Sequence, residues 1–340
     1  MNNIRFQDKQ SGSTLTPNFT FLKQEPAECD AKLKTEVTIG ICVRNAGKYI
    51  KNAIQSIMDQ DFPSQSMEII FVDDGSDDDT LKVIRDHASK MNIRYKIFSD
   101  KWRGLGPVRQ TVVENADGQY IIWVDGDTTL SKDYVSQQVA FMKQHPKAGI
   151  AVGNYFDYNN LHKLRNQNLV EFLEQASFVA MGVKHEGKPT RKLPGTCGST
   201  YRVTALKQTG GFDKNITGAG EDLDAAYRIR EAGWEIYLST GGSLNSKNKE
   251  TWAGLWNQYR WHAYGFYLVS RKHKDLERLY NMLPLTVFLS GLLRSLVAYK
   301  ITNKKAVFLL PFQSVFKISA WWVGFIDGYL HFHKHRLQKK

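Results

Sequence analysis

Two aspartates that follow an apolar run are the residues in this sequence best suited to chemistry. Asp125 and Asp127 come directly after residues 120–124, YIIWV, and only Gly126 separates them. Carboxylate oxygens are the ligands that Mg²⁺ and Mn²⁺ prefer, and these ions keep positions open for phosphate oxygens. The small glycine lets the backbone approach a ligand closely. Because acidic turns also occur without any metal, the pair alone is weak evidence for a metal site, and the neighbouring motifs must support it.

A second acidic segment, residues 72–80 with the sequence VDDGSDDDT, also follows an apolar run. Ser76 or Asp77 can cap the helix that is expected to start there, which is ordinary helix chemistry. Capping does not explain Asp73 and Asp74, which stand at the end of the expected strand. Carboxylates in that position can accept hydrogen bonds from a nucleobase N–H or from ribose hydroxyls.

Two further segments place charged residues beside glycines. In residues 103–109, RGLGPVR, the glycines allow a close turn, and Arg109 falls in the first turns of the following helix. An arginine there can bind phosphate, brace an aspartate or simply lie at the surface. In residues 218–230, Glu221 and Asp222 open an amphipathic helix, where the helix dipole favours acidic side chains. A carboxylate at that place can also act as a general base towards a hydroxyl group.

The elements that would position these residues alternate between strands and helices. Apolar, β-branched runs and helical spacing predict strands at 37–43, 68–72, 93–98 and 120–124, and helices at 47–60, 80–88 and 107–116. This alternation indicates an α/β domain with a mostly parallel sheet and helices on both faces. Ligands bind such sheets in the crevice beyond the carboxyl ends of the strands. Asp74 and Asp125 both stand at that edge, so the expected site agrees with the expected fold.

With these four segments in this order, the chain resembles the family 2 glycosyltransferases of the GT-A fold, from about residue 37 to residue 234. Further motifs that carry the resemblance are GSTYR at 198–202, GGFD at 210–213 and GED at 220–222. The resemblance implies a Rossmann-like domain and a metal-dependent, hexosyltransferase-like enzyme. Such enzymes move a sugar from a nucleoside diphosphate to an acceptor hydroxyl or phosphate, and most of them invert the anomeric carbon.

On the donor side, the resemblance implies that Asp74, with Asp73 beside it, binds the nucleotide base or the ribose. Asp125 and Asp127 would hold Mn²⁺ or Mg²⁺ together with the donor diphosphate, and Asp127 would be the more direct metal ligand. Arg109 occupies a basic position that in the family often lies near the donor. These five residues are the expected donor and metal site.

On the acceptor side, the resemblance implies that Asp222 is the general base, because it matches the position of that residue in the family. The residues expected to contact the acceptor are Glu221, Gly198, Arg260 and Trp261. Together they would bring the acceptor hydroxyl to the carboxylate of Asp222.

The sequence departs from the family pattern at two places. Family members often have a histidine after the catalytic helix that completes the metal shell, but residues 239–246 contain none, so no third protein ligand is assigned. Processive synthases of the family carry Gln-x-x-Arg-Trp, whereas residues 257–261, NQYRW, have Asn257 at the glutamine position. A polymer product is therefore not inferred from this motif.

The net charge of +12 would attract an acidic partner, and the location of the charge decides which one. Thirteen lysines and arginines but three acidic residues lie between residue 271 and the C-terminus, a region that also contains the apolar runs 283–299 and 306–330. Each run is near the length limit for spanning a bilayer and contains ionisable residues, so spanning, interfacial and core helices all remain open. Basic flanks are typical of segments beside an anionic membrane, and membrane association is favoured.

These patterns divide the chain into a polar extension at 1–35, a catalytic domain at 36–270 and a helical membrane-associated region at 271–340. A chain cut near Lys274 is therefore expected to be soluble and to bind the donor. The three cysteines lack metal or redox spacing, which favours free thiols in a reducing compartment. The N-terminus lacks an apolar signal core, so the catalytic part is expected at the cytoplasmic face of the cell membrane. The expected partners are a nucleotide-sugar donor, a glycan or lipid-linked acceptor, and the membrane.

The strongest alternative is a haloacid dehalogenase-like phosphohydrolase, because residues 125–130, DGDTTL, also fit its Asp-x-Asp-x-Thr pattern. That motif usually opens its domain, whereas a long α/β pattern precedes it here, and the segment 72–80 would have no role. A second alternative, a non-catalytic nucleotide-sugar-binding protein, would not need the full set of acidic residues. No nucleic-acid partner is expected, since the positive charge lies in an apolar region without a known nucleic-acid motif.

Overall fold

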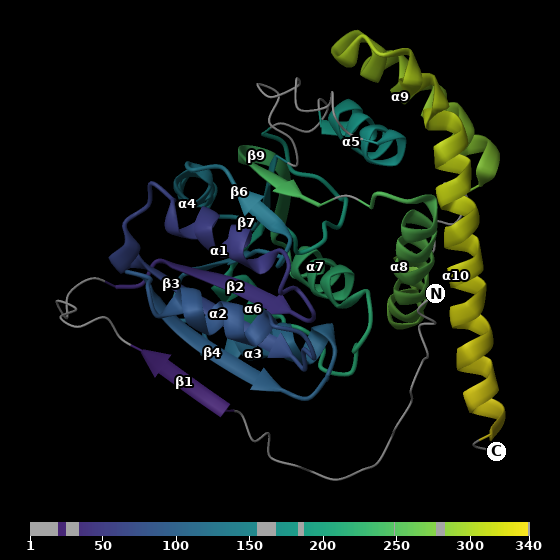
Figure 1. The fold of residues 1–340 in the computed structure, drawn as a ribbon. Helices are drawn as coiled ribbons and strands as arrows, with labels where there is room; N and C mark the ends of the chain where they lie inside the picture. Colours follow the sequence, from purple (N-terminus) through teal and green to yellow (C-terminus); the bar gives the residue numbers. More distant parts are fainter. Residues whose placement is uncertain are drawn as a thin grey trace.

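The computed structural model describes residues 20–24, 34–154, 168–182, 187–247, 249–276 and 283–338. In this part of the chain a twisted sheet lies between helices on both faces, and a group of longer helices stands along one side (Figure 1). Cys42 and Cys197 are present as thiols, while Cys29 lies outside the described residues.

The first half of the sheet is parallel, as the sequence predicts. Its strands are β2 (Val37–Val43), β3 (Met67–Asp74), β4 (Arg94–Asp100) and β5 (Tyr120–Trp123), in the spatial order β4-β3-β2-β5. Every residue of β3 is buried, which is typical of a parallel strand covered on both faces. All four predicted strands are confirmed to within two residues, and their carboxyl ends meet at one edge of the sheet.

The second half adds strands of mixed direction. These are β6 (Thr128–Leu130), β7 (Ala148–Asn154), β8 (Ser199–Arg202) and β9 (Glu235–Ser246). β8 lies antiparallel between β5 and β7, β9 runs parallel to β7, and β6 pairs antiparallel with β9. The described residues thus form a nine-stranded mixed sheet in the order β1-β4-β3-β2-β5-β8-β7-β9-β6.

The polar N-terminal extension predicted at 1–35 contains one element of this sheet. β1 (Thr20–Gln24) pairs antiparallel with β4 and forms the edge of the sheet on that side. The sequence did not predict this strand, because a short edge strand with little apolar periodicity has no clear pattern of its own. The rest of the extension up to residue 33 lies outside the described residues.

Two sets of helices cover the sheet. One hydrophobic core joins the sheet to α1 (Ile50–Met58), α2 (Thr80–Ala88) and α4 (Tyr134–Gln144). A second core joins its other face to α3 (Leu105–Asn115), α6 (Val203–Gln208) and α7 (Glu221–Glu231). The predicted helices at 47–60, 80–88 and 107–116 are confirmed as α1, α2 and α3. A short 3₁₀ turn, Ser64–Ser66, leads into β3.

The remaining helices form a separate layer beside the sheet. It consists of α5 (Leu169–Gly182), α8 (Trp252–Lys272), α9 (Pro284–Thr302) and α10 (Leu310–Gln338), with 3₁₀ turns at Lys274–Leu276 and Lys305–Leu309. α10 runs along α8, and α5 packs against α9 (Figure 1). At Gly324 of α10 an added Cβ would overlap the carbonyl oxygen of Arg260, so the backbones of α8 and α10 touch there.

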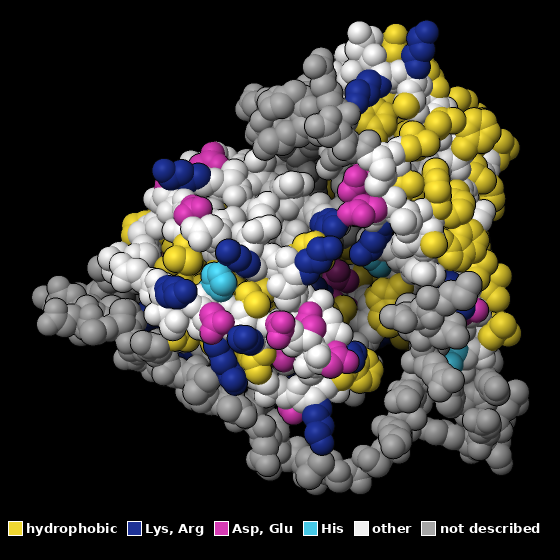
Figure 2. All heavy atoms as spheres, viewed as in Figure 1, with side chains coloured by type: hydrophobic (Ala, Val, Ile, Leu, Met, Phe, Trp, Pro, Cys, Tyr) yellow, Lys and Arg dark blue, Asp and Glu magenta, His cyan; other side chains and the backbone are white. Residues whose placement is uncertain are grey.

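The layer of long helices leaves a large apolar surface open to solvent. The exposed large side chains include Leu285, Leu289, Leu293 and Leu296 on α9, and Phe312, Ile326 and Leu330 on α10. They form a continuous band along this side of the molecule (Figure 2). Among the described residues, two helices, Pro284–Thr302 and Lys305–His331, are long and apolar enough to cross a membrane.

The packing of α8 bears on the expectation that a chain cut near Lys274 is soluble and binds the donor. α10 covers α8 through Ile318 and Trp321, which form a buried cluster with Ala263. Removing α9 and α10 would expose that apolar face of α8 to water. α8 and α10 thus share a buried cluster across the boundary predicted at residue 270, which stays a prediction.

Candidate active site

The loop after β5 opens into a pocket of about 540 Å³, which Asp125 lines but Asp73, Asp74 and Asp127 do not. Asp125 in the loop after β5, Arg109 of α3 and Asp222 of α7 all line it. The other walls come from residues 195–197, from the segment that follows β9, and from α5, α8 and α10. The pocket therefore connects the crevice of the sheet with the layer of long helices.

Asp125 and Asp127 lie together beyond β5. Burial raises the pKa of Asp125, the nearby charge of Arg109 lowers it, and the negative charge of Asp127 raises it again. Asp127 accepts a long hydrogen bond from Ser246 Oγ, with 3.5 Å between the two oxygens. Two close carboxylates in a partly buried place repel each other, and a cation would offset this repulsion.

The donor set of this pair fits a hard divalent cation. Among the described residues, no group of three or more His, Cys, Asp or Glu side chains could hold an ion. Mg²⁺ and Mn²⁺ are commonly bound through one or two carboxylates, and substrate phosphates and water fill the other positions. The residues present therefore fit such an ion if a diphosphate supplies the remaining ligands.

Asp74 holds the loop that precedes α3. Its two carboxylate oxygens accept hydrogen bonds from the backbone N–H groups of Arg103, at 2.7 Å, and Gly104, at 2.9 Å. Burial raises the pKa of Asp74, and these hydrogen bonds partly oppose the rise. Gly104 has φ +92°, and a Cβ there would overlap the backbone of Thr217. The glycine predicted to allow a close turn is therefore required by this geometry.

The other acidic residues of the segment 72–80 organise the loops around the sheet edge. Asp73 is buried and accepts a hydrogen bond from the Ser76 hydroxyl. Asp78 Oδ1 accepts from the Thr80 N–H at the start of α2, while its Oδ2 accepts from the Gly47 N–H at 3.1 Å. The side chain that satisfies the first turn of α2 is thus Asp78 and not Ser76 or Asp77. These contacts lie within the chain, and nucleotide binding by Asp73 and Asp74 stays a prediction.

Arg109 and Glu221 form a buried ion pair. The arginine comes from α3 and the glutamate from the first turn of α7, and both side chains are more than nine-tenths buried. Both also line the pocket, and the charge of Arg109 lowers the pKa of Asp125. The structure therefore brings a residue predicted for the donor side into contact with one predicted for the acceptor side.

Asp222 lies half-buried at the start of α7 and faces the pocket from that end. Its Oδ1 accepts a hydrogen bond from the Leu223 N–H at 2.7 Å. The chain at Gly195 passes so close that a Cβ there would stand 3.3 Å from Asp222 Oδ2. His262 of α8 lines the same pocket; burial lowers its pKa, and the negative charge of Asp222 opposes this. A carboxylate in this place can take a proton from a group bound in the pocket.

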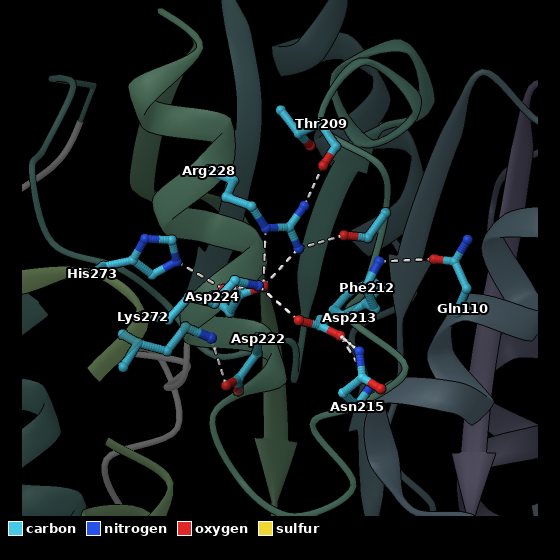
Figure 3. A network of polar contacts seen from close by, with 12 residues as sticks. Gln110, Thr209, Phe212, Asp213, Asn215, Asp222, Asp224, Arg228, Lys272 and His273 are labelled. Carbon is cyan, nitrogen blue, oxygen red and sulfur yellow. Dashed lines mark hydrogen bonds and ion pairs between the residues drawn. The ribbon is translucent and has the colours of Figure 1, made fainter. Parts of the chain in front are cut away.

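A buried polar network fixes the helix that carries Asp222 (Figure 3). Asp224 of α7 is fully buried and contacts Arg228 at 2.7 Å, Lys272 at 2.9 Å and His273 at 2.8 Å. Burial alone would raise the pKa of Asp224, but the hydrogen bonds of Lys272 and His273 and the charge of Arg228 outweigh it and lower that pKa. Since Lys272 and His273 stand at the end of α8, the network joins α7 to α8 and so positions Asp222.

Of the remaining residues predicted for the acceptor side, Trp261 lines the pocket and Gly198 and Arg260 do not. Trp261 lines the pocket, where its ring packs against Gly218. Gly198 follows the lining residues 195–197 and packs against Tyr134 and Leu244. Arg260 is not among the lining residues and pairs with Asp327 of α10, its Nε 2.6 Å from the carboxylate. A structural role of Arg260 between two helices is thus visible, while its contact with an acceptor stays a prediction.

The residues that line this pocket and that sequence reasoning missed include His262, Glu174 and Trp321. His262 follows Arg260-Trp261 directly, so the same motif could have drawn attention to it. Glu174 and Trp321 lie on α5 and α10, far from any motif in the sequence. Only the packing of α10 against α8, and of α5 against α9 and α10, brings them to the pocket.

The sequence of the sheet-forming half is similar to known enzymes. Residues 38–209, half of the chain, match the family described as Glycosyl transferase family 2. A stretch of 101 residues, 30% of this chain, is 31% identical to poly(ribitol-phosphate) beta-N-acetylglucosaminyltransferase TarS of Staphylococcus aureus, although it covers 18% of that protein. Over 92% of this chain and 70% of the relative, the chain is 22% identical to poly-beta-1,6-N-acetyl-D-glucosamine synthase of Staphylococcus epidermidis.

The fold is also shared with a solved enzyme structure. Mannosyltransferase PcManGT from Pyrobaculum calidifontis, determined in complex with GDP-Man and Mn²⁺, matches with a TM-score of 0.60 and 15% identity, over 89% of this chain and 90% of that one. At this identity the likeness shows the fold alone, and it confirms the predicted fold class. With the family match across half of its length, the chain belongs to the family 2 glycosyltransferases.

Proposed function

We propose that this glycosyltransferase moves a sugar from a nucleoside diphosphate to an acceptor hydroxyl in the pocket between the sheet edge and α8. The observation that carries the proposal is the presence of Asp125 and Asp222 on the walls of one pocket. One carboxylate stands where a donor diphosphate would be held, and the other stands where an acceptor would be deprotonated. Donor binding and acceptor deprotonation would thus take place in one pocket.

On the donor side, Asp125 and Asp127 would hold Mn²⁺ or Mg²⁺ with the diphosphate. Such a cation, when bound, neutralises charge on the departing nucleoside diphosphate. Asp74 keeps the 103–104 loop in place beside this region, through the two backbone hydrogen bonds described above. Lys247 and Lys249, which line the pocket after β9, add positive charge near the position of the diphosphate.

On the acceptor side, Asp222 would take the proton from the attacking hydroxyl. The acceptor oxygen forms a bond to the anomeric carbon as the bond from that carbon to the diphosphate oxygen breaks, and the nucleoside diphosphate leaves. Attack from the side opposite the leaving group inverts the anomeric carbon. The ion pair of Arg109 with Glu221 and the network around Asp224 both hold α7, and so keep Asp222 in place for this step.

The acceptor is proposed to be a glycan of the cell surface or its lipid-linked precursor, reached from the cytoplasmic face of the membrane. Two relatives support this by their names, which describe synthesis of poly-N-acetylglucosamine and glycosylation of poly(ribitol-phosphate). The exposed apolar band on α9 and α10 supports membrane association. No observation favours the phosphohydrolase alternative, and the match of residues 38–209 to the glycosyltransferase family supports the transferase.

The proposal is tested by a donor screen on the full-length protein in detergent. Binding of uridine, guanosine and thymidine diphosphate sugars is measured by calorimetry, with Mn²⁺ and then with chelator. We expect one nucleotide class to bind only with metal, and Asp127→Ala to abolish that binding. The matched control is Asp79→Ala, which removes an exposed carboxylate with no capping hydrogen bond at the start of α2. Full donor affinity in chelator, or in the Asp127 variant, would contradict the metal role.

A further inference from the structure

The pocket continues past the reacting carboxylates into the layer of long helices. Beyond Asp222 its walls include Glu174 and Phe178 of α5, Phe266 of α8 and Trp321 of α10. None of these residues belongs to the sheet or to the motifs of the family. This part of the pocket, which we term the helical subsite, is therefore formed by the layer of long helices.

A buried carboxylate faces the helical subsite. Glu174 is 5% exposed and its Oε1 lies 2.7 Å from Lys317 Nζ. Lys317 in turn lies 4.7 Å above the ring centre of Tyr259, which also lines the pocket. Lys317 is not among the lining residues. The ammonium group thus supports Glu174 from behind, and the group offered to a ligand is a carboxylate.

A second cationic side chain near Glu174, Arg294, also binds groups outside the pocket. Arg294 of α9 donates hydrogen bonds to the hydroxyls of Ser177 and Ser314, at 3.2 and 3.4 Å, and it does not line the pocket. A phosphate in the helical subsite would therefore meet the Glu174 carboxylate before it met either cation. Like charges at short distance repel, so an anionic ligand is disfavoured there.

Aromatic side chains supply the rest of the helical subsite. Trp321 is held in place by Phe325, with stacked rings 5.2 Å apart, and by Phe266 at 5.4 Å. Phe178 of α5, which is 38% exposed, also lines the pocket. Fixed aromatic faces beside a few precisely placed polar groups form a binding site for a ligand with an apolar face and a polar edge. A sugar ring has this shape, because its C–H groups cover one face and its hydroxyls project from the edge.

We propose that the helical subsite binds an uncharged or amino sugar ring of the acceptor. A hydroxyl or amino group of that ring donates a hydrogen bond to Glu174, while its C–H face packs against Trp321. The inference rests on the proposed function, since it extends the acceptor beyond the hydroxyl that Asp222 deprotonates. Glu174 and Trp321 are then binding residues for the acceptor and have no part in holding the donor.

The test measures sugar binding without turnover. Full-length protein in detergent with UDP and Mn²⁺ is titrated with N-acetylglucosamine and glucosamine and with the dimers and trimers of each, and binding is followed by saturation-transfer NMR. Three variants are compared: Glu174→Gln, the pair Glu174→Gln with Lys317→Met, which leaves no unpaired buried charge, and Trp321→Leu. The matched control is Glu171→Gln, one turn earlier on α5 and outside the pocket. Thermal unfolding and UDP binding of each variant report on folding and on the donor side.

We expect the paired variant to bind the sugars about tenfold more weakly or worse, the usual effect of losing a hydrogen bond to a charged group, with UDP binding unchanged. Trp321→Leu should also weaken sugar binding, and Glu171→Gln should not. Unchanged sugar binding in the paired variant, or no binding by any sugar of the panel, would overturn the proposal. A phosphate subsite would also overturn the proposal. It would appear if dodecyl phosphate displaces the sugar from the unchanged protein but not from the single variant Lys317→Met.

These outcomes are separate from those of the proposed function. Failure of the proposed function would appear as absence of sugar transfer from every donor. Failure of the helical subsite would appear as sugar binding that does not depend on Glu174, even if transfer occurs.

Discussion

At the residue scale, the pairing of Arg109 with Glu221 changes how both residues are understood. The family resemblance assigned Arg109 to the donor side and Glu221 to the acceptor side. In the structure they neutralise each other, with side chains 9% and 1% exposed. A residue at a motif position can thus bind another side chain of the protein rather than a ligand.

This pairing leads to a prediction about stability. Arg109→Met leaves Glu221 buried without its partner, and breaking a buried pair in this way typically costs about 3–5 kcal/mol of the free energy of unfolding. The double variant Arg109→Met with Glu221→Gln removes both charges and should recover much of that loss. Chemical unfolding of the two variants measures the difference. If Arg109→Met is as stable as the unchanged protein but loses donor binding, the arginine contacts the donor directly and the pair is incidental.

The sequence identified site residues by two routes: the ends of strands in the parallel half, and positions that match motifs of the family, which gave Arg109, Asp222 and Trp261. Asp74 and Asp125 were found because apolar strands end directly before them and parallel strands end at one edge. His262 was missed because its role depends on which face of α8 meets the pocket. Glu174 and Trp321 were out of reach, since a contact between α5 and α10 leaves no local signal in either segment.

At the element scale, the close contact of α8 and α10 is the feature that completes the pocket. Gly324→Ala places a Cβ against the carbonyl oxygen of Arg260, and overpacking of this kind typically costs about 1–3 kcal/mol. We expect a lower melting temperature and weaker binding of any acceptor that reaches Trp321. The matched control is the exposed neighbour, Val323→Ala, which should change neither. Equal melting temperatures for the two variants would show that α10 can shift without cost.

The elements themselves were predictable to different degrees along the chain. The first half is read well because it alternates apolar strands with amphipathic helices, each long enough to show its period. The second half was not assigned strand by strand: β6 and β8 have three and four residues, and β9 contains Gly241 and Gly242 with positive φ. Short strands and glycine bends interrupt the period of two on which a strand prediction depends.

At the scale of the whole molecule, charge and apolar surface coincide. The C-terminal fifth of the chain carries most of the net positive charge, and the same region exposes the leucines and phenylalanines of α9 and α10. The buried ion pair of Lys317 with Glu174 and the contacts of α10 with α8 connect this surface to the pocket. Membrane attachment and acceptor binding would then share one set of helices.

This arrangement predicts how the protein fractionates. Full-length protein should sediment with membranes and remain there through a high-salt wash, because salt screens the contribution of basic residues, roughly 1 kcal/mol each, but not the apolar contact. Replacing Leu289, Leu293 and Leu296 by serine should make the attachment sensitive to salt. Appearance of the unchanged protein in the soluble fraction without detergent would contradict membrane association.

In the proposed reaction Asp222 is the base for transfer, and the donor side of the pocket does not depend on it. The most direct measurement is the turnover of Asp222→Asn beside its affinity for the donor, once the donor screen has named one. Asparagine keeps the shape of the side chain and removes its basicity, so turnover should fall by roughly 10²–10⁴-fold while the donor Kd stays unchanged. Near-normal turnover in Asp222→Asn, or loss of its donor binding, would contradict the role of Asp222 as the general base.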